Sequence, residues 1–204
     1  SGAMILEYEK KNNLKISKWI DEQIKNFLTA AENGYFNVKE DGCIVHTVDY
    51  TKTPAEIEHI EKLQRKRKIQ TLRTKPIGVI RKKITDKLSR FSFTEGLEEG
   101  YHIFDLYGFA LLKNLYGEHT IFKSDKLEKA LCYALDTDKL LELRNSCGGS
   151  NFNKFAFGYN SPAFEYPFVA YSFRGAIDQN LENELFQFQI ENTYENGEFS
   201  YNCE

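Results

Sequence analysis

The stretch NFNKFAFGYNSPAFEYPFVAYSFR, residues 151–174, decides how the rest of this chain is interpreted. It holds nine Phe or Tyr residues, two prolines and one carboxylate, Glu165, in 24 positions. Such a run is too aromatic for a solvated loop and too interrupted for an ordinary core helix. It predicts a rigid surface with polar groups set into it. The competing interpretation is that most of these rings belong to the core.

The length and composition predict one domain that spans residues 5–204. The chain has 204 residues, and 41% of them are hydrophobic, which is enough for a sizeable core. Residues 1–3, Ser-Gly-Ala before Met4, are interpreted as a cloning scar. No apolar run approaches the roughly 18 residues that span a bilayer, so we expect a cytoplasmic protein. The four cysteines lie far apart and outside zinc spacing, so free thiols, no metal and no cofactor are expected.

The net charge of −3 conceals a basic segment at residues 62–90, where twelve Lys and Arg residues face one acid, Asp86. Concentrated positive charge attracts an anionic partner such as nucleic acid or an acidic glycan. Arg81 and Lys82 of this segment are predicted to contact such a glycan. The alternative is a solvated helix face, or a patch neutralised by acids elsewhere in the chain.

The pattern of apolar residues predicts a mainly α-helical α+β domain of helical hairpins with one β-hairpin near the N-terminus. Asp41-Gly42 between two alternating runs, residues 35–39 and 43–48, indicates the hairpin. Residues 77–93 fit a second basic helix or extended chain, and residues 178–194 favour a helix over a strand. The core is expected in the helices that contain Trp19, Tyr101, Leu127 and Phe164. Helices are predicted at residues 17–32, 53–72, 101–116, 124–136, 138–145, 163–173 and 178–194, with a short extended tail at 198–203.

His102 and Asp105 lie three residues apart at the start of the 101–116 helix, so they share one helical face. A histidine beside a carboxylate is suited to proton transfer, because its pKa lies near neutrality. The alternative is a hydrogen bond that satisfies two polar groups at the start of a buried helix. His46 and Asp49 lie on a predicted strand at a spacing that points them to opposite faces, so no shared metal is expected.

Glu165 lies between aromatic residues, and a carboxylate buried against rings has a raised pKa. Raised carboxylates serve as general acids in glycan-cleaving enzymes. The alternative is an exposed glutamate on an amphipathic helix. Tyr159 and Asn160 begin a turn that could position sugar hydroxyls, and the same residues are ordinary turn formers.

Two segments carry a family resemblance: the helix that opens with Tyr101-His102 and ends in Leu-Tyr-Gly, and the later Gly-Tyr-Asn-Ser-Pro-Ala-Phe-Glu run at 158–165. Their order over residues 100–194 resembles the later part of α/α-toroid proteins, which are found among glycoside hydrolases, polysaccharide lyases and sugar epimerases. The resemblance implies a cup that binds and cleaves sugars. By position in that cup, the candidates are His102, Asp105, Asn160 and Glu165.

The chain departs from the toroid pattern in two respects. A complete toroid has many more helices, and the predicted hairpin and basic segment have no toroid counterpart. A partial toroid that forms a homo-oligomer, a fragment, and a different helical fold therefore all stay open.

The leading hypothesis is carbohydrate binding or processing, by a hydrolase or lyase if catalytic, in a cleft between the Tyr101 helix start and residues 159–168. The basic segment favours an acidic glycan. Glu165 or His102 would donate or accept the proton, Asp105 would assist, and Tyr101, Tyr159 and Asn160 would bind substrate. The alternative is a nucleic-acid or protein interaction module that uses residues 62–90 without catalysis.

Overall fold

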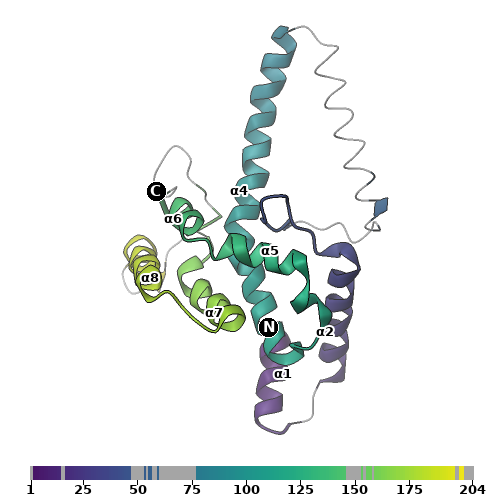
Figure 1. Ribbon diagram of the computed structural model, residues 1–204. Helices are drawn as coiled ribbons and strands as arrows, with labels where there is room; N and C mark the ends of the chain where they lie inside the picture. The colour runs from purple at the N-terminus through teal and green to yellow at the C-terminus, as the bar shows by residue number, and fades with distance from the viewer. Residues whose placement is uncertain are drawn as a thin grey trace.

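The computed structural model describes residues 2–14, 17–46, 53, 55, 56, 59, 77–145, 153, 155–157, 159–195, 198 and 199, with backbone alone for 77–95, 195, 198 and 199. This part of the chain is mostly helical (Figure 1). The α-helices are α1 Gly2–Lys11, α2 Lys18–Ala30, α4 Ile77–Tyr116, α5 Asp125–Ala134, α6 Thr137–Asn145, α7 Pro162–Arg174 and α8 Gln179–Thr193. A π-helical turn, Ala31–Tyr35, follows α2, and a 3-10 turn, Thr120–Lys123, precedes α5.

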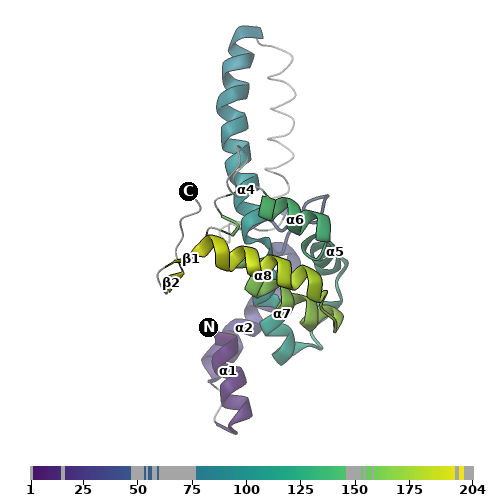
Figure 2. The ribbon, with the colours of Figure 1, turned by 90° about the vertical axis from the view of Figure 1, so that its left-hand side faces the viewer.

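Helix α4 is the spine of the fold. Its 40 residues include both the ambiguous segment 77–93 and the predicted helix 101–116, and its N-terminal half extends beyond the other helices (Figures 1 and 2). The sequence interpretation began a helix at Tyr101, after Gly96 and Gly100, but α4 continues through both glycines. Gly100 instead allows a close approach, because a Cβ there would lie 2.5 Å from the backbone and Cβ of Phe155.

The N-terminal helices lie beside one end of α4. Helix α1 was not predicted, and its Leu6 is buried. Helix α2 matches the predicted helix 17–32, but its apolar face is only partly used. Leu28 is buried, whereas Trp19 is 71% exposed, because α2 enters the core only at its C-terminal end. The expectation that Trp19 marks a core face is therefore wrong.

The predicted β-hairpin is not formed as two regular strands in the described residues. The tight turn exists, but a single antiparallel bridge, Val38 to Ile44, closes it. Gly42 has a φ of +107°, and a Cβ there would lie 2.8 Å from both Lys129 O and Tyr133 Cβ of α5. The segment at 36–46 therefore packs against α4 and α5 instead of extending a ladder. The described strands are β1 Tyr194–Glu195 and β2 Glu198–Phe199, an antiparallel pair of two residues each.

Side-chain caps set the ends of the later helices. The Ser124 hydroxyl accepts from Leu127 N before α5, and the Asp178 carboxylate accepts from Asn180 N and Leu181 N before α8. Helix α6 is capped by Asp136, which accepts from Lys139 N. Residues 178–194 are helical up to Thr193, so the competing strand interpretation is wrong.

The core gathers side chains from α2, α4, α5, α7, α8 and the segment 36–46 around the C-terminal half of the spine. Helix α7 packs on α4, and α8 packs on α7 (Figure 2). This arrangement is a long helix covered by shorter ones, and it gives the toroid prediction no support in the described part of the chain. The core includes the fully buried Leu28, Leu106, Ala110, Leu127, Ala130, Phe157, Val169 and Leu185.

Several predictions lie outside the described residues. Asp49, Cys147 and most of the basic segment at residues 62–90 belong to this group, as does most of the predicted helix 53–72. The start of that helix is described: Thr53 and Glu56 bond each other reciprocally, as a capping box does. In the ranges that the structure describes, no helix is long and apolar enough to cross a membrane.

Candidate functional site

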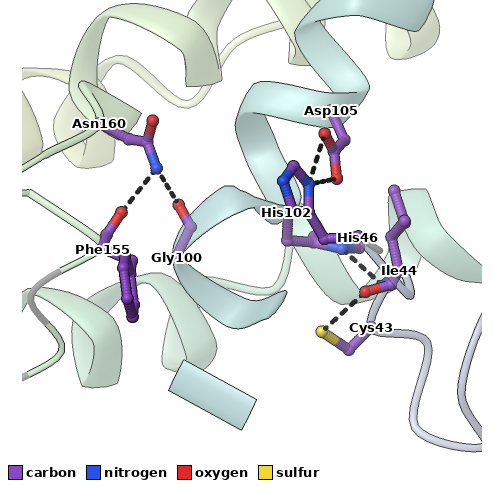
Figure 3. A network of polar contacts seen from close by, with 8 residues as sticks. All are labelled: Cys43, Ile44, His46, Gly100, His102, Asp105, Phe155 and Asn160. Atoms are coloured by element: carbon purple, nitrogen blue, oxygen red, sulfur yellow. Dashed lines mark hydrogen bonds and ion pairs between the residues drawn. The ribbon is translucent and has the colours of Figure 1, made fainter. Parts of the chain in front are cut away.

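Helix α7 runs beside the C-terminal half of α4 in the same direction, and three contacts fix its position. Asn160 donates from Nδ2 to Gly100 O at 2.8 Å and to Phe155 O at 2.6 Å (Figure 3). Further along, the Tyr107 and Phe168 rings meet at 5.2 Å, and Lys113 Nζ donates to Ser172 O at 2.7 Å. The Tyr101 helix turn and the 159–168 segment therefore lie side by side, as the sequence interpretation expected. Glu165 falls at the level of Asp105.

Asp105 pairs with His46, a residue to which the sequence interpretation assigned no role. His46 Nδ1 lies 2.9 Å from Asp105 Oδ2 and 3.1 Å from Oδ1 (Figure 3). Burial raises the pKa of Asp105 above its usual value, and the bond from His46 acts in the opposite direction. Nε2 of His46 has no hydrogen-bond partner among the described residues, so it can serve a ligand. A histidine held by a carboxylate through one nitrogen is suited to exchange a proton through the other.

Tyr101 joins this pair to the aromatic segment. Its ring stacks on His46 with a centroid distance of 4.3 Å and lies 5.7 Å from the ring of Tyr159. Burial, with the hydrogen bond to Tyr159, raises the pKa of Tyr101 to about 12, so the phenol keeps its proton at neutral pH. Tyr159 is 57% exposed. Ring contacts through Tyr159 and Tyr101 therefore connect the solvent-exposed surface to the His46–Asp105 pair.

Glu165 is the carboxyl group of this site with the most unusual environment. Burial raises its pKa to about 7, the nearby Asp105 carboxylate adds to the rise, and a hydrogen bond from the Ser161 backbone opposes it. Its Oε2 is buried without a hydrogen-bond partner among the described residues. A buried carboxyl oxygen without a partner is best satisfied by carrying a proton that a ligand can accept. We call His46, Tyr101, Asp105, Tyr159 and Glu165 the acid–base cluster.

His102 lies on α4 in a different environment. Its Nδ1 accepts from Ile44 N at 3.0 Å, and its Nε2 donates to Ala130 O at 2.9 Å. The side chain is 1% exposed, and burial lowers its pKa to about 4. Both ring nitrogens are thus occupied by backbone groups of different segments. In this arrangement His102 links the segment 36–46, α4 and α5, and it shares no hydrogen bond with Asp105.

Of the remaining predicted site residues, Asn160 has a structural role, and the side chains of Arg81 and Lys82 lie outside the described part of the chain. Asn160 is 7% exposed, and its amide NH2 is used by two backbone carbonyls, so it fixes the approach of α7 to α4. Arg81 and Lys82 lie in the N-terminal half of α4, where only the backbone is described. In the described ranges, no group of three or more His, Cys, Asp or Glu side chains is arranged to hold a metal ion.

His46 was missed because its partner is 59 residues away in the sequence. The sequence interpretation paired it with Asp49, at a spacing that argues against contact on a strand. The sequence does show that His46 follows a turn whose apolar residues had to pack on a helix. That signal does not identify which helix.

Comparison with known proteins finds an informative similarity. A stretch of 98 residues, 48% of this chain, is 32% identical to archaeal glycosylation protein Q from Haloferax volcanii. The matched stretch, about half of this chain, covers 24% of that relative's length. No family model and no solved structure matches the chain.

Proposed function

We propose that this chain binds and processes a carbohydrate at the acid–base cluster, between the start of the Tyr101 turn and the 159–168 segment. The observation that carries the proposal is Glu165, a half-buried side chain whose Oε2 is buried without a protein partner among the described residues and whose pKa is raised to about 7. The relative's name refers to glycosylation, which supports a glycan-related role. The two tyrosines supply rings for sugar faces and hydroxyls for sugar oxygens.

The chemistry follows from the protonation states. A pKa raised to about 7 lets Glu165 hold a proton near neutral pH, which makes Glu165 the proton donor to a leaving oxygen. His46, oriented by Asp105, is the base. In hydrolysis, the C–O bond breaks, the leaving oxygen takes the Glu165 proton, and water adds to the carbon and gives its proton to His46. In a lyase, His46 removes a carbon-bound proton, and Glu165 protonates the same leaving oxygen.

An acidic glycan remains the proposed substrate class, because residues 62–90 supply twelve basic residues. Arg81 and Lys82 are proposed to contact its carboxylates. His102 is proposed to act as a positioning residue, because both of its nitrogens are already bonded. A partial toroid and a homo-oligomer are not needed for this proposal.

The test is a turnover screen of the full chain against oligosaccharides that contain uronic acids, with Glu165→Gln as the matched variant. We expect Glu165→Gln to lower turnover by about 100-fold or more, because the amide cannot donate an acidic proton. Glu118→Gln, whose side chain is 99% exposed after the end of α4, is the control and keeps full turnover. Reducing ends without new ultraviolet absorbance indicate hydrolysis, and an unsaturated absorbing product indicates elimination. Unchanged turnover in a folded Glu165→Gln protein contradicts the assignment.

The nucleic-acid alternative rests on residues 62–90 alone. It predicts binding of RNA or DNA that weakens steeply with added salt. Binding of that kind, together with no binding of any glycan, favours the alternative.

A further inference from the structure

A pocket of about 370 Å³ adjoins the acid–base cluster on the side away from α7. It lies between α2, the segment 36–46 and α4, and Gly2 and Ala3 at the start of α1, two of the residues interpreted as a cloning scar, add to its wall. His46 and Asp105 form part of its wall, so the same pair belongs both to the cluster and to the pocket. The rest of the lining is mainly apolar and includes Ile24, Phe27, Ala31, Phe36, Phe109 and Leu112.

Gly108 contributes to the depth of this pocket. It lies on α4 one turn after Asp105, and a Cβ built on it meets nothing within 4 Å. Alanine in the interior of a helix is more favourable than glycine, because glycine loses more backbone freedom on folding. Glycine at this position therefore keeps the pocket open, although alanine would make the helix more stable.

The size of the pocket limits what can occupy it. One turn of an α-helix, about 10 Å wide and 5.4 Å long, occupies about 400 Å³, so the pocket cannot enclose a helix and holds at most a few side chains or a small molecule. The volume lies at the small end of the range for small-molecule sites. A single aromatic ring or a short alkyl chain fits.

The polar wall sets a second condition. A purely apolar ligand would shield the His46–Asp105 pair from water and offer no hydrogen bonds in place of those to water. A ligand that also carries hydroxyl groups next to its apolar part satisfies both the apolar lining and this wall. A sugar joined to an apolar group has that arrangement.

We propose that the pocket binds the apolar aglycone, an aryl or short alkyl group, of a glycoside whose sugar lies at the acid–base cluster. This inference rests on the proposed function and names the substrate class of the same site. In this arrangement the aglycone faces α1 and α2, and the sugar faces Tyr159. Free oligosaccharides use only the sugar side and bind more weakly.

The test compares methyl and phenyl glucuronides by calorimetric titration of the full chain. Burial of the ring predicts binding about 10–100-fold tighter for the phenyl glucuronide, with a more negative heat-capacity change. Gly108→Leu fills the pocket and brings the phenyl glucuronide to the methyl level, while methyl binding is unchanged. Gly108→Ala is the matched control and keeps most of the difference.

A measurement on the unmodified protein guards against a variant that does not fold. Intermolecular nuclear Overhauser effects from the phenyl ring to the methyl groups of Ile24 and Ala31 are expected. Equal affinity for the two glucuronides, or no such effects, overturns the pocket assignment and leaves the carbohydrate proposal standing. Phenol bound as tightly as phenyl glucuronide shows that the sugar contributes nothing, and it overturns the carbohydrate proposal as well.

Discussion

The imidazole of His46 meets the carboxylate of Asp105 at 2.9 Å, and this contact joins the segment after the Gly42 turn to the middle of α4. It also joins two regions of different character. One is the aromatic segment with Glu165, and the other is the apolar pocket between α1 and α2. Because the Asp105 carboxylate contributes to the raised pKa of Glu165, a change at Asp105 should be felt at Glu165.

Asp105→Asn is expected to lower the pKa of Glu165 from about 7, because it removes a nearby negative charge. A carbon-13 titration of the Glu165 carboxyl group measures this shift. Asp21→Asn, in a pair with Lys25 away from the cluster, is the control and leaves the pKa unchanged. An unchanged Glu165 pKa in Asp105→Asn would mean that the two carboxyl groups are not coupled.

Glu165→Gln is expected to flatten part of the dependence of stability on pH. The folded-state pKa of about 7 lies above the ordinary value of 4.5, so the folded state binds the proton more tightly. The unmodified protein therefore loses stability as pH rises from 4.5 to 7, by at most about 3 kcal/mol and less with solvent screening. Urea unfolding at pH 5 and pH 8 should show Glu165→Gln more stable than the parent at pH 8 only. Parallel curves would refute the raised pKa.

The helices were predictable where caps and apolar spacing agree. Ser124 caps α5 at the start of the predicted helix 124–136, and Leu181 and Leu185 are buried on α8, within the predicted helix 178–194. Gly96 and Gly100 led to a wrong helix boundary, because a glycine that allows close packing looks the same in a sequence as one that bounds a helix. The hairpin was over-predicted for a similar reason. Gly42 permits a tight turn, but contacts with α5 set the path of the chain after that turn.

The candidate site was predictable only in part. The neighbourhood of Tyr101 and Tyr159 follows from two aromatic segments that had to pack on each other. His102 and His46 could not be told apart by local pattern, since their partners come from segments 28 to 59 residues away. Burial of one and partial exposure of the other arise only in the tertiary structure.

His102→Gln and His102→Ala test the structural role of the buried histidine. Alanine leaves Ile44 N and Ala130 O without partners in the core, and we expect a loss of about 2–4 kcal/mol in the free energy of unfolding. The His102 pKa of about 4 lies below the ordinary 6.5, so the parent loses about 3 kcal/mol as pH falls from 6.5 to 4. His102→Gln should remove that acid sensitivity. Retained acid sensitivity in His102→Gln would place its origin elsewhere.

Asn160→Ala is expected to destabilise the fold by about 1–3 kcal/mol, because two buried carbonyl groups, Gly100 O and Phe155 O, lose their donor. Asn160→Asp should be worse, since it sets a carboxylate against two acceptors. The matched control is Asn192→Ala, whose amide bonds Phe188 O on an exposed surface and should change stability by less than about 0.5 kcal/mol. Chemical unfolding of the three variants measures the difference, and equal losses at Asn160 and Asn192 would refute it.

Gly100→Ala tests the close contact that holds α7 and the aromatic segment to the spine. A Cβ at this position would lie 2.5 Å from Phe155 backbone and side-chain atoms, so either Phe155 or α4 must move. We expect a loss of about 1–3 kcal/mol, together with a disturbed Tyr101–Tyr159 contact that is visible in the near-ultraviolet circular dichroism. Gly108→Ala, on the same helix with nothing within 4 Å, should instead gain about 0.5–1 kcal/mol. Both changes add one methyl group to α4. A loss of stability at Gly100 with a gain at Gly108 therefore separates the effect of the Phe155 contact from that of helix propensity. A gain at both positions would mean that the segment around Phe155 does not rest on Gly100.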